Sequence, residues 1–244
     1  MTAPQKEFNI VKLIGIVLLH LIGAGGLTLL IYGQYTGLFV VPPDGHMGDI
    51  ARILFVHVPS AWNSMAVYTV GFVVAVLSLV TMRKGFDHAL VACLEVGTLL
   101  TVLLIIQGSI FARLTWGVWW TWDPRLSSSA GMLLTYVGVL ILRTLIVDAD
   151  RKAVVTAVVT ILASATVPLT YFSVQLWRSI HQLQTAPTDI DDPLKFAWRI
   201  NAIAFALIAV WLIGRRYRIA QHTYESRKAP PLPPADPPPM AEAL

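Results

Sequence analysis

The sequence predicts an all-α integral membrane protein with six transmembrane helices. Its 244 residues are 56% hydrophobic and only 13% charged, well below the roughly 25% of charged residues that is usual in soluble domains. A helix that crosses a bilayer needs about 20 predominantly apolar residues. Six segments meet this requirement, at about residues 12–32, 60–81, 89–110, 127–147, 153–172 and 196–214.

The distribution of Lys and Arg predicts the orientation of these spans, because cytoplasmic connections carry an excess of basic residues. The N-terminus, the connections around Arg83 and Arg151, and the segment from Arg215 to Lys228 hold twelve of the 18 Lys and Arg residues. All four regions lie on one side of a six-span chain, so both termini are expected in the cytoplasm. Short outer (periplasmic) loops then remain at residues 33–59, 111–126 and 173–195.

The two ends of the chain differ in character. The first apolar segment follows a basic N-terminus, but it is too long for a usual signal core and no small-residue cleavage site follows, so it is expected to remain as a span. Three glycines in it permit close helix packing: Gly23, Gly25 and Gly26. Residues 1–218 are assigned to the membrane domain. Residues 219–244, which end in a proline-rich stretch, are expected to form a disordered or polyproline II tail in the cytoplasm.

The most unusual segment is WGVWWTWDPRLSSS, from Trp116 to Ser129, in the loop at about residues 113–129. It holds four of the eight Trp residues within seven positions. A membrane anchor normally uses one or two Trp at an interface, so this density indicates an aromatic platform for a flat ligand. A helical loop would place Trp116, Trp119 and Trp120 on one face. An extended loop would instead place Trp116, Trp120 and Trp122 there, and both geometries remain open.

Charged and small polar residues close this loop. Asp123 precedes a proline, so it is expected in an extended or turn conformation rather than in a helix. It can pair with Arg125 or orient the loop. Three serines follow and are expected to cap the fourth span: Ser127, Ser128 and Ser129.

Two of the six histidines combine an outer position with apolar and aromatic neighbours. His57, in FVHVPSAW, precedes the second span, and Pro59 beside it suits a first helical turn. His181, in QLWRSIHQLQ, follows the fifth span on the same side. Two imidazoles at matching depth beside the Trp-rich loop could bind one metal from opposite faces.

The remaining histidines and the single cysteine have simpler explanations. His46, His88 and His222 fall in connections and are expected to be solvated. His20 lies within the first span, where an ionisable residue can mark a functional site, but a neutral imidazole bonded to a neighbouring helix is expected. Cys93 is expected to be a small buried hydrophobe, since no C-x-x-C-H motif for covalent haem and no zinc-type cysteine pair is present.

Haem is the ligand that satisfies both the Trp platform and the histidine pair. Its macrocycle stacks on indoles, and its iron takes axial imidazoles, which must be neutral to donate. Its two propionates need cations, for which the arginine fork is well suited. Arg52 lies five residues before His57, and Arg125 closes the Trp loop.

These segments resemble a known family. WGVWWTWDPRLSSS resembles the Trp-rich WWD signature of membrane proteins that handle haem in cytochrome c maturation. RILFVHVPSAW, the six-span plan and the outer histidine after the fifth span are similar to the haem exporter protein C (cytochrome c maturation protein C) family, over the chain up to about Arg218. The resemblance implies that His57 and His181 are the axial pair for haem b. It assigns the WWD site to Trp116, Trp119, Trp120, Trp122 and Asp123, while Pro124 departs from the expected pattern.

The resemblance also implies a function and a set of partners. The chain would be a haem-presenting subunit of the bacterial inner membrane, associated with the ATPase and permease subunits of an ABC transporter complex. It would deliver haem at the periplasmic face to a membrane-anchored haem chaperone, with a small single-span protein bridging the two. No G-x-x-x-x-G-K-[ST] phosphate-binding loop is present, and no nucleophile or general base is evident, so the chain is not expected to be an enzyme.

Two alternative functions remain open. A b-type electron-transfer cytochrome would carry histidine pairs inside its spans, but only His20 lies near the middle of a span. A solute permease would show several intramembrane charges, whereas Glu95 is the sole acidic residue in a span and could cap a helix or pair with a neighbour. The net charge of +4 comes from residues that form no face or stripe, so no nucleic-acid partner is expected.

Overall fold

The computed structural model describes residues 10–181 and 192–228, and within these ranges it contains helices but no strand. The helices are α1 (Ile10–Tyr35), α2 (Leu54–Thr81), α3 (Lys84–Trp116), α4 (Pro124–Leu145), α5 (Ala149–Ala163), α6 (Thr166–Leu176) and α7 (Asp192–Lys228). Two short helical segments, η1 (Thr36–Val40) and η2 (Asp49–Ile53), lie between α1 and α2. Six helical stretches are long and apolar enough to cross a membrane, which confirms the expected number of spans.

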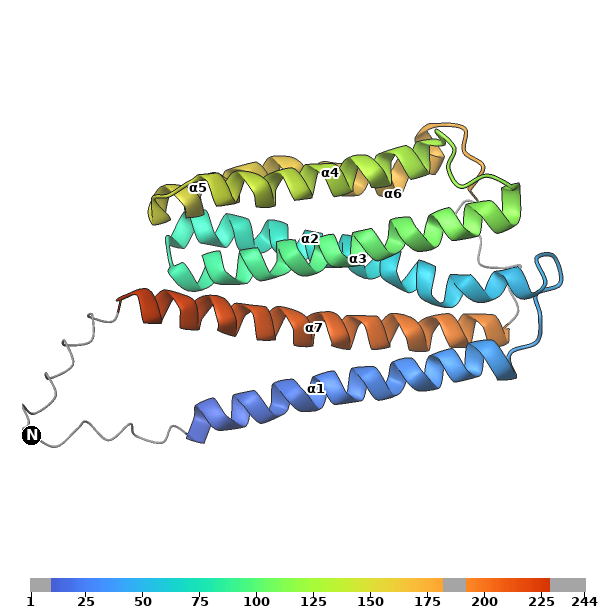
Figure 1. Cartoon of the computed structure of the whole chain (residues 1–244), viewed down its shortest axis with the longest axis horizontal. Coiled ribbons are helices and arrows are strands. Elements are labelled where there is room, and N and C mark those ends of the chain that lie inside the picture. Colours follow the sequence, from blue (N-terminus) through green and yellow to red (C-terminus); the bar gives the residue numbers. More distant parts are fainter. Residues whose placement is uncertain (1–9, 182–191, 229–244) are drawn as a thin grey trace, which may run out of the picture.

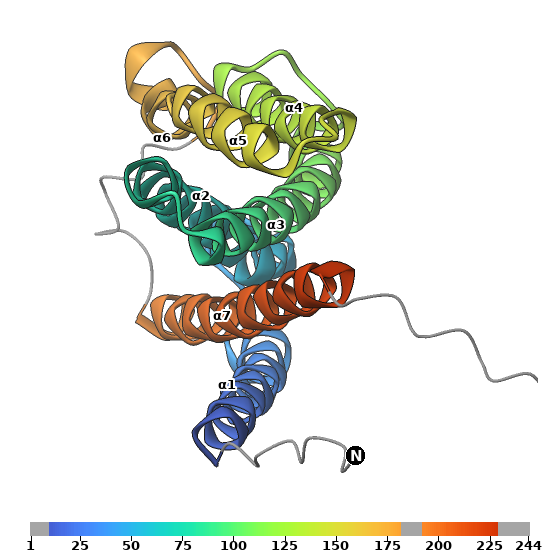
Figure 2. The same cartoon turned by 90° about the vertical axis from the view of Figure 1, so that its left-hand side faces the viewer.

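The helices are arranged in layers around a central antiparallel pair, α2 and α3 (Figures 1 and 2). Helices α4, α5 and α6 cover one side of this pair, α7 packs on the other side, and α1 lies outermost against α7. The N-terminal end of α1 and the C-terminal end of α7 lie at the same end of the bundle (Figure 1). The loop at residues 117–123 lies at the opposite end, which is called the Trp-loop end below.

Several helices are longer than the apolar segments that predict them. Helix α3 begins five residues before the expected start at residue 89, and α7 continues to Lys228. The expected disorder of residues 219–244 is therefore wrong for residues 219–228. That stretch contains no Gly or Pro, and the first proline after it is Pro230, so nothing in it ends a helix. The proline-rich stretch itself lies outside the described residues.

The fifth span is divided into α5 and α6 by a turn at residues 164–165. Pro168, in the first turn of α6, has no N–H to donate to the carbonyl of Ser164 four residues earlier. That carbonyl accepts instead from the N–H of Val167 at 3.1 Å, a tighter turn than an α-helix makes. The proline thus explains why one apolar segment forms two helices.

Two expected helix starts need correction. Pro59 is the sixth residue of α2 rather than a first-turn residue, because the helix begins at Leu54. Asp123, not a serine, caps α4: its side chain accepts a hydrogen bond from the backbone N–H of Arg125. Asp123 itself is extended, as expected, with φ −63° and ψ 142°. The three serines lie inside α4: Ser127, Ser128 and Ser129.

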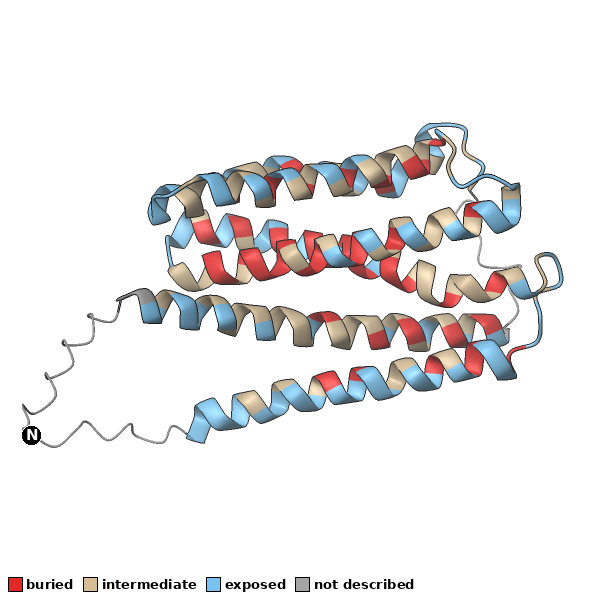
Figure 3. Ribbon diagram, in the orientation of Figure 1, coloured by how far each residue is buried: buried red, intermediate tan, exposed pale blue. Residues whose placement is uncertain are grey.

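Buried positions are concentrated along α2 and α3 (Figure 3). At the centre, the rings of Tyr68 and Tyr136 stack with their centroids 3.5 Å apart, and Gly97 leaves room for the Tyr68 ring. Farther out, α1 and α7 approach closely: a side chain at Gly23 would collide with Trp211. A side chain at Gly26 would press on α7 as well, whereas Gly25 faces open space, so two of the three glycines have the expected packing role.

Polar residues within the helices are paired with other helices. Glu95 forms an ion pair with Arg216 of α7, and His20 is bonded to Arg215 of the same helix, as expected for structural groups. His88 was expected in solvent but is only 8% exposed. It is covered because α3 starts early and α7 runs past it, placing two tyrosine rings against the imidazole: Tyr217 and Tyr224. Cys93 is buried among apolar side chains, as expected.

Candidate functional site

A cavity of about 610 Å³ lies at the Trp-loop end of the bundle. This volume falls in the range of small-molecule sites, roughly 300–1,000 Å³. Its walls come from α2, α3, α4, the start of α7 and the loops around them. Within the described part of the chain, its ionisable lining residues are His57, Arg125, His181, Lys195 and Arg199, and no Asp or Glu lines it.

His57 enters this cavity from the first turns of α2. Its ring stacks on Phe111 of α3, with centroids 6.4 Å apart and planes at 15°. Gly108 leaves the space for it, because a Cβ at that position would lie 3.1 Å from the imidazole Cε1. The Nδ1 atom is buried and has no hydrogen-bond partner among the described residues. The imidazole is therefore held by packing and keeps a nitrogen free.

His181 reaches the same cavity from the segment that follows α6. Its ring meets the edge of Trp116 at a centroid distance of 5.5 Å, and Trp116 in turn contacts Phe111 at 5.7 Å. A continuous set of aromatic contacts thus joins the two histidines. Burial, assisted by the positive charge of Arg125, lowers the pKa of His181 below its ordinary value of 6.5 and outweighs the opposing effect of Asp123. The imidazole is therefore neutral at pH 7.

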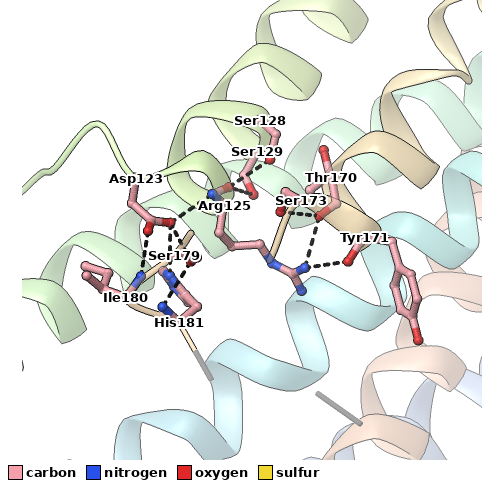
Figure 4. A network of polar contacts seen from close by, with 10 residues as sticks. All are labelled: Asp123, Arg125, Ser128, Ser129, Thr170, Tyr171, Ser173, Ser179, Ile180 and His181. Carbon is pink, nitrogen blue, oxygen red and sulfur yellow. Dashed lines mark hydrogen bonds and ion pairs between the residues drawn. The ribbon is translucent and has the colours of Figure 1, made fainter. Parts of the chain in front are cut away.

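Asp123 fastens the His181 segment to the Trp loop (Figure 4). Its carboxylate accepts hydrogen bonds from the Ile180 N–H at 2.8 Å and the Ser179 hydroxyl at 3.0 Å. It also lies 3.3 Å from His181 Nδ1, although the angle there does not make a hydrogen bond. Burial raises the pKa of Asp123, but the hydrogen bonds, led by those from the Ile180 and Arg125 backbones, lower it further. A stable carboxylate thus faces one edge of the imidazole.

The four Trp residues divide into two pairs. Trp116 and Trp120 line the cavity, whereas Trp119 and Trp122 do not and are 60% and 86% exposed. The division arises because α3 ends at Trp116 and Gly117 takes a left-handed φ of 77°, after which residues 117–123 form neither helix nor strand. Neither the helical nor the extended geometry considered for the loop describes it fully.

Arg125 lies at the cavity wall and also ties two helices together. Its Nη1 donates to the carbonyl oxygens of Thr170 at 3.0 Å and Tyr171 at 2.9 Å in α6 (Figure 4). Both carbonyls lie in the middle of α6, and that of Thr170 also accepts a hydrogen bond from the Ser173 hydroxyl at 2.8 Å. Arg125 thus holds α6 against α4 close to His181.

Arg52, predicted beside Arg125 as a propionate ligand, is not brought to the cavity. Its guanidinium donates to the carbonyl oxygens of Gly37 at 2.6 Å and Val41 at 3.1 Å, and its Nε donates to Asp49 at 2.8 Å. These contacts hold the connection between α1 and α2 in place. Sequence spacing from His57 could not reveal that the side chain turns away.

Three lining residues from α7 were not singled out in the sequence: Lys195, Trp198 and Arg199. Lys195 and Arg199 lie four residues apart, so they share one face of the helix. Their place in an outer connection was visible in the sequence, but the packing of α7 against α2 was not. The Nε1 atom of Trp198 is buried, with no hydrogen-bond partner among the described residues.

Comparison with known proteins places the chain in a family. A model of the family described as Heme exporter protein C matches residues 2–230. Heme exporter protein C of Bradyrhizobium diazoefficiens is 32% identical over 221 residues, which cover 85% of this chain and 84% of the relative. The proteins of the same name from Haemophilus influenzae and Escherichia coli are 32% and 30% identical over 79% and 78% of this chain, and over 80% and 78% of the relatives. The chain therefore belongs to the heme exporter protein C family.

Proposed function

We propose that this chain is a haem-binding membrane subunit for c-type cytochrome biogenesis and that haem b is its cargo. The iron is ligated axially by His57 and His181, and the macrocycle lies against Trp116 and Trp120. The observation that carries the proposal is that these four side chains line one cavity. The relatives named heme exporter protein C support the same cargo.

The donor set suits haem. Both histidines keep a buried Nδ1 without a hydrogen bond. Because the Asp123 carboxylate lies 3.3 Å from His181 Nδ1, Nε2 is the nitrogen left for iron. Asp123 holds the segment that carries this imidazole through the Ile180 N–H and the Ser179 hydroxyl. No group of three or more His, Cys, Asp or Glu in the described ranges is placed to hold a bare metal ion. Haem needs only two axial donors, because the macrocycle supplies the rest of the coordination.

The site lies at one end of the bundle, where a partner can reach the cargo. We propose that this end faces the periplasm of the bacterial inner membrane and that haem passes from it to a membrane-anchored haem chaperone. ATPase and permease subunits of an ABC transporter and a small single-span bridging protein complete the assembly. The chain itself positions haem and is not an enzyme. The exposed side chains of Trp119 and Trp122 support a contact with a partner protein at this end.

Titration of haem into the purified protein tests the cavity and separates the two Trp pairs. Wild-type protein is expected to show one saturable site. Trp116→Ala with Trp120→Ala should weaken binding about 10- to 100-fold, because each lost aromatic contact contributes roughly 0.5–1.5 kcal/mol beyond burial. The matched pair Trp119→Ala with Trp122→Ala should bind haem as the wild type does. Absence of saturable binding, or equal losses in both double variants, would contradict the proposal.

The lowered pKa of His181 predicts how acid releases the iron. A protonated imidazole cannot ligate, so this ligand is lost as the pH falls through its pKa, and burial places that pKa below 6.5. In His57→Ala, where His181 is the remaining axial donor, haem affinity should therefore be level at alkaline pH and decline with a midpoint below pH 6.5. Haem titrations across this range measure the midpoint. A midpoint above 6.5 would show that His181 is not the buried donor described here.

A further inference from the structure

We infer that the first turns of α7 form the carboxylate-binding end of the cavity, where Arg199 and Lys195 hold the two haem propionates. The inference rests on the proposed haem binding and names the residues that select a porphyrin with free carboxylates. Both cations line the cavity and lie one helical turn apart on the same face of α7.

The charges around the cavity favour α7 over the opposite wall. Helices α4 and α7 lie on opposite sides of the α2–α3 pair (Figure 2). Both propionates extend from one edge of the macrocycle, so one side must receive them together. The α4 side offers a single cation, Arg125, whose Nη1 already donates to two carbonyls of α6. On the α7 side, Arg199 lines the cavity and makes no hydrogen bond or ion pair with any described residue, and Lys195 lies one helical turn before it.

Trp198 gives an independent indication that this part of the cavity binds a carboxylate of the ligand. Its Nε1 is buried in the wall between Lys195 and Arg199, and no described residue accepts its hydrogen bond. An indole N–H can only donate, and a buried donor without a partner is costly. A carboxylate oxygen is an acceptor, so a propionate bound by the neighbouring cations would satisfy this group as well.

The position of Arg199 along the bundle axis also fits a role in binding a propionate. Asn63 of α2 donates to the carbonyl of Ala202 at 3.1 Å, and α2 and α7 both run inward from the Trp-loop end. Arg199, three residues before Ala202, is therefore close to the level of His57. The deep end of the cavity is lined by Met65 and Met132, and Met65 lies about 12 Å inward of His57 along α2. That apolar end suits the methyl and vinyl edge of haem.

The test compares iron protoporphyrin IX with its dimethyl ester, which lacks free carboxylates. Wild-type protein in lipid nanodiscs is expected to prefer the diacid by about tenfold per cation. Lys195→Gln with Arg199→Gln should remove this preference and leave affinity for the diester unchanged. Trp198→Phe should weaken only the diacid. Arg218→Gln is the matched control, because it lies on the same helix about 28 Å from Arg199 and should behave as the wild type.

The outcomes separate this inference from the proposed function. If wild-type protein binds neither porphyrin, haem binding itself is wrong. If it binds both equally, or if the double glutamine variant keeps the full preference for the diacid, haem binding stands and the role of α7 is overturned. Should the double variant bind neither ligand, the charge-preserving pair Lys195→Arg with Arg199→Lys decides: a retained preference supports the inference, and its loss rejects it.

Discussion

Replacement of His57 and His181 together by alanine is expected to give a protein that inserts into the membrane normally but contains no haem. Both imidazoles line the cavity, and their removal takes away both axial donors. Each single variant should keep one ligand and give a five-coordinate, high-spin spectrum with weaker retention. Haem content and absorbance of the purified variants measure the effect.

Two exposed histidines provide the matched control for this experiment. His46 and His222 are both exposed and do not line the cavity, so their joint replacement by alanine should leave haem content and spectrum unchanged. If the His57 and His181 double variant retained normal haem with a low-spin spectrum, the axial assignment would be wrong.

The second large effect is expected from Asp123→Asn. The amide keeps the size of the side chain, but its NH₂ group would face either the Ile180 N–H or the two donors on the other oxygen, so at least one accepted hydrogen bond must be lost. Replacing a group that orients a metal ligand typically weakens binding about 10- to 100-fold. Haem affinity should fall by this amount while insertion and helix content remain normal.

A pH profile distinguishes this positioning role from general loosening of the loop. The carboxylate favours the protonated form of His181 and so opposes the lowering of its pKa by burial. Without the charge the pKa falls further, and the acid midpoint of haem binding in the His57→Ala background should move to lower pH. A solvated, loosened His181 would move the midpoint upward instead. Asp148→Asn is the control, because Asp148 also caps a helix, accepting from the Arg151 N–H at 2.7 Å, and does not line the cavity.

The sequence was sufficient to predict the six spans, because long apolar segments have few structural alternatives in a membrane protein. It was not sufficient to locate helix ends. Helix α7 continues for more than three turns beyond the end of its apolar segment. Hydrophobicity indicates which residues lie in the bilayer, but it does not indicate where the helical backbone ends. The fifth span is divided into two helices because Pro168 has no backbone N–H, and this division was not predicted from the apolar segment.

The candidate site was predictable to a similar degree. His57, His181 and the Trp loop stood out by composition, and the structure brings them to one cavity. Which indoles face inward depended on Gly117, where the chain leaves α3 with a left-handed turn. The different surroundings of Arg52 and Arg125, and the presence of Arg199 in the wall, result from contacts between helices far apart in the sequence. Spacing along one chain segment carries no information about such contacts.

The tyrosine stack beneath the cavity has a consequence for traffic through the protein. Met65 and Met132, which line the deep end, belong to the same packed cluster as the fully buried Tyr68 and Tyr136. The cavity is therefore closed at its deep end by packed side chains, whereas its other lining residues lie toward the Trp-loop end of the bundle. A porphyrin bound in it would enter and leave at that same end.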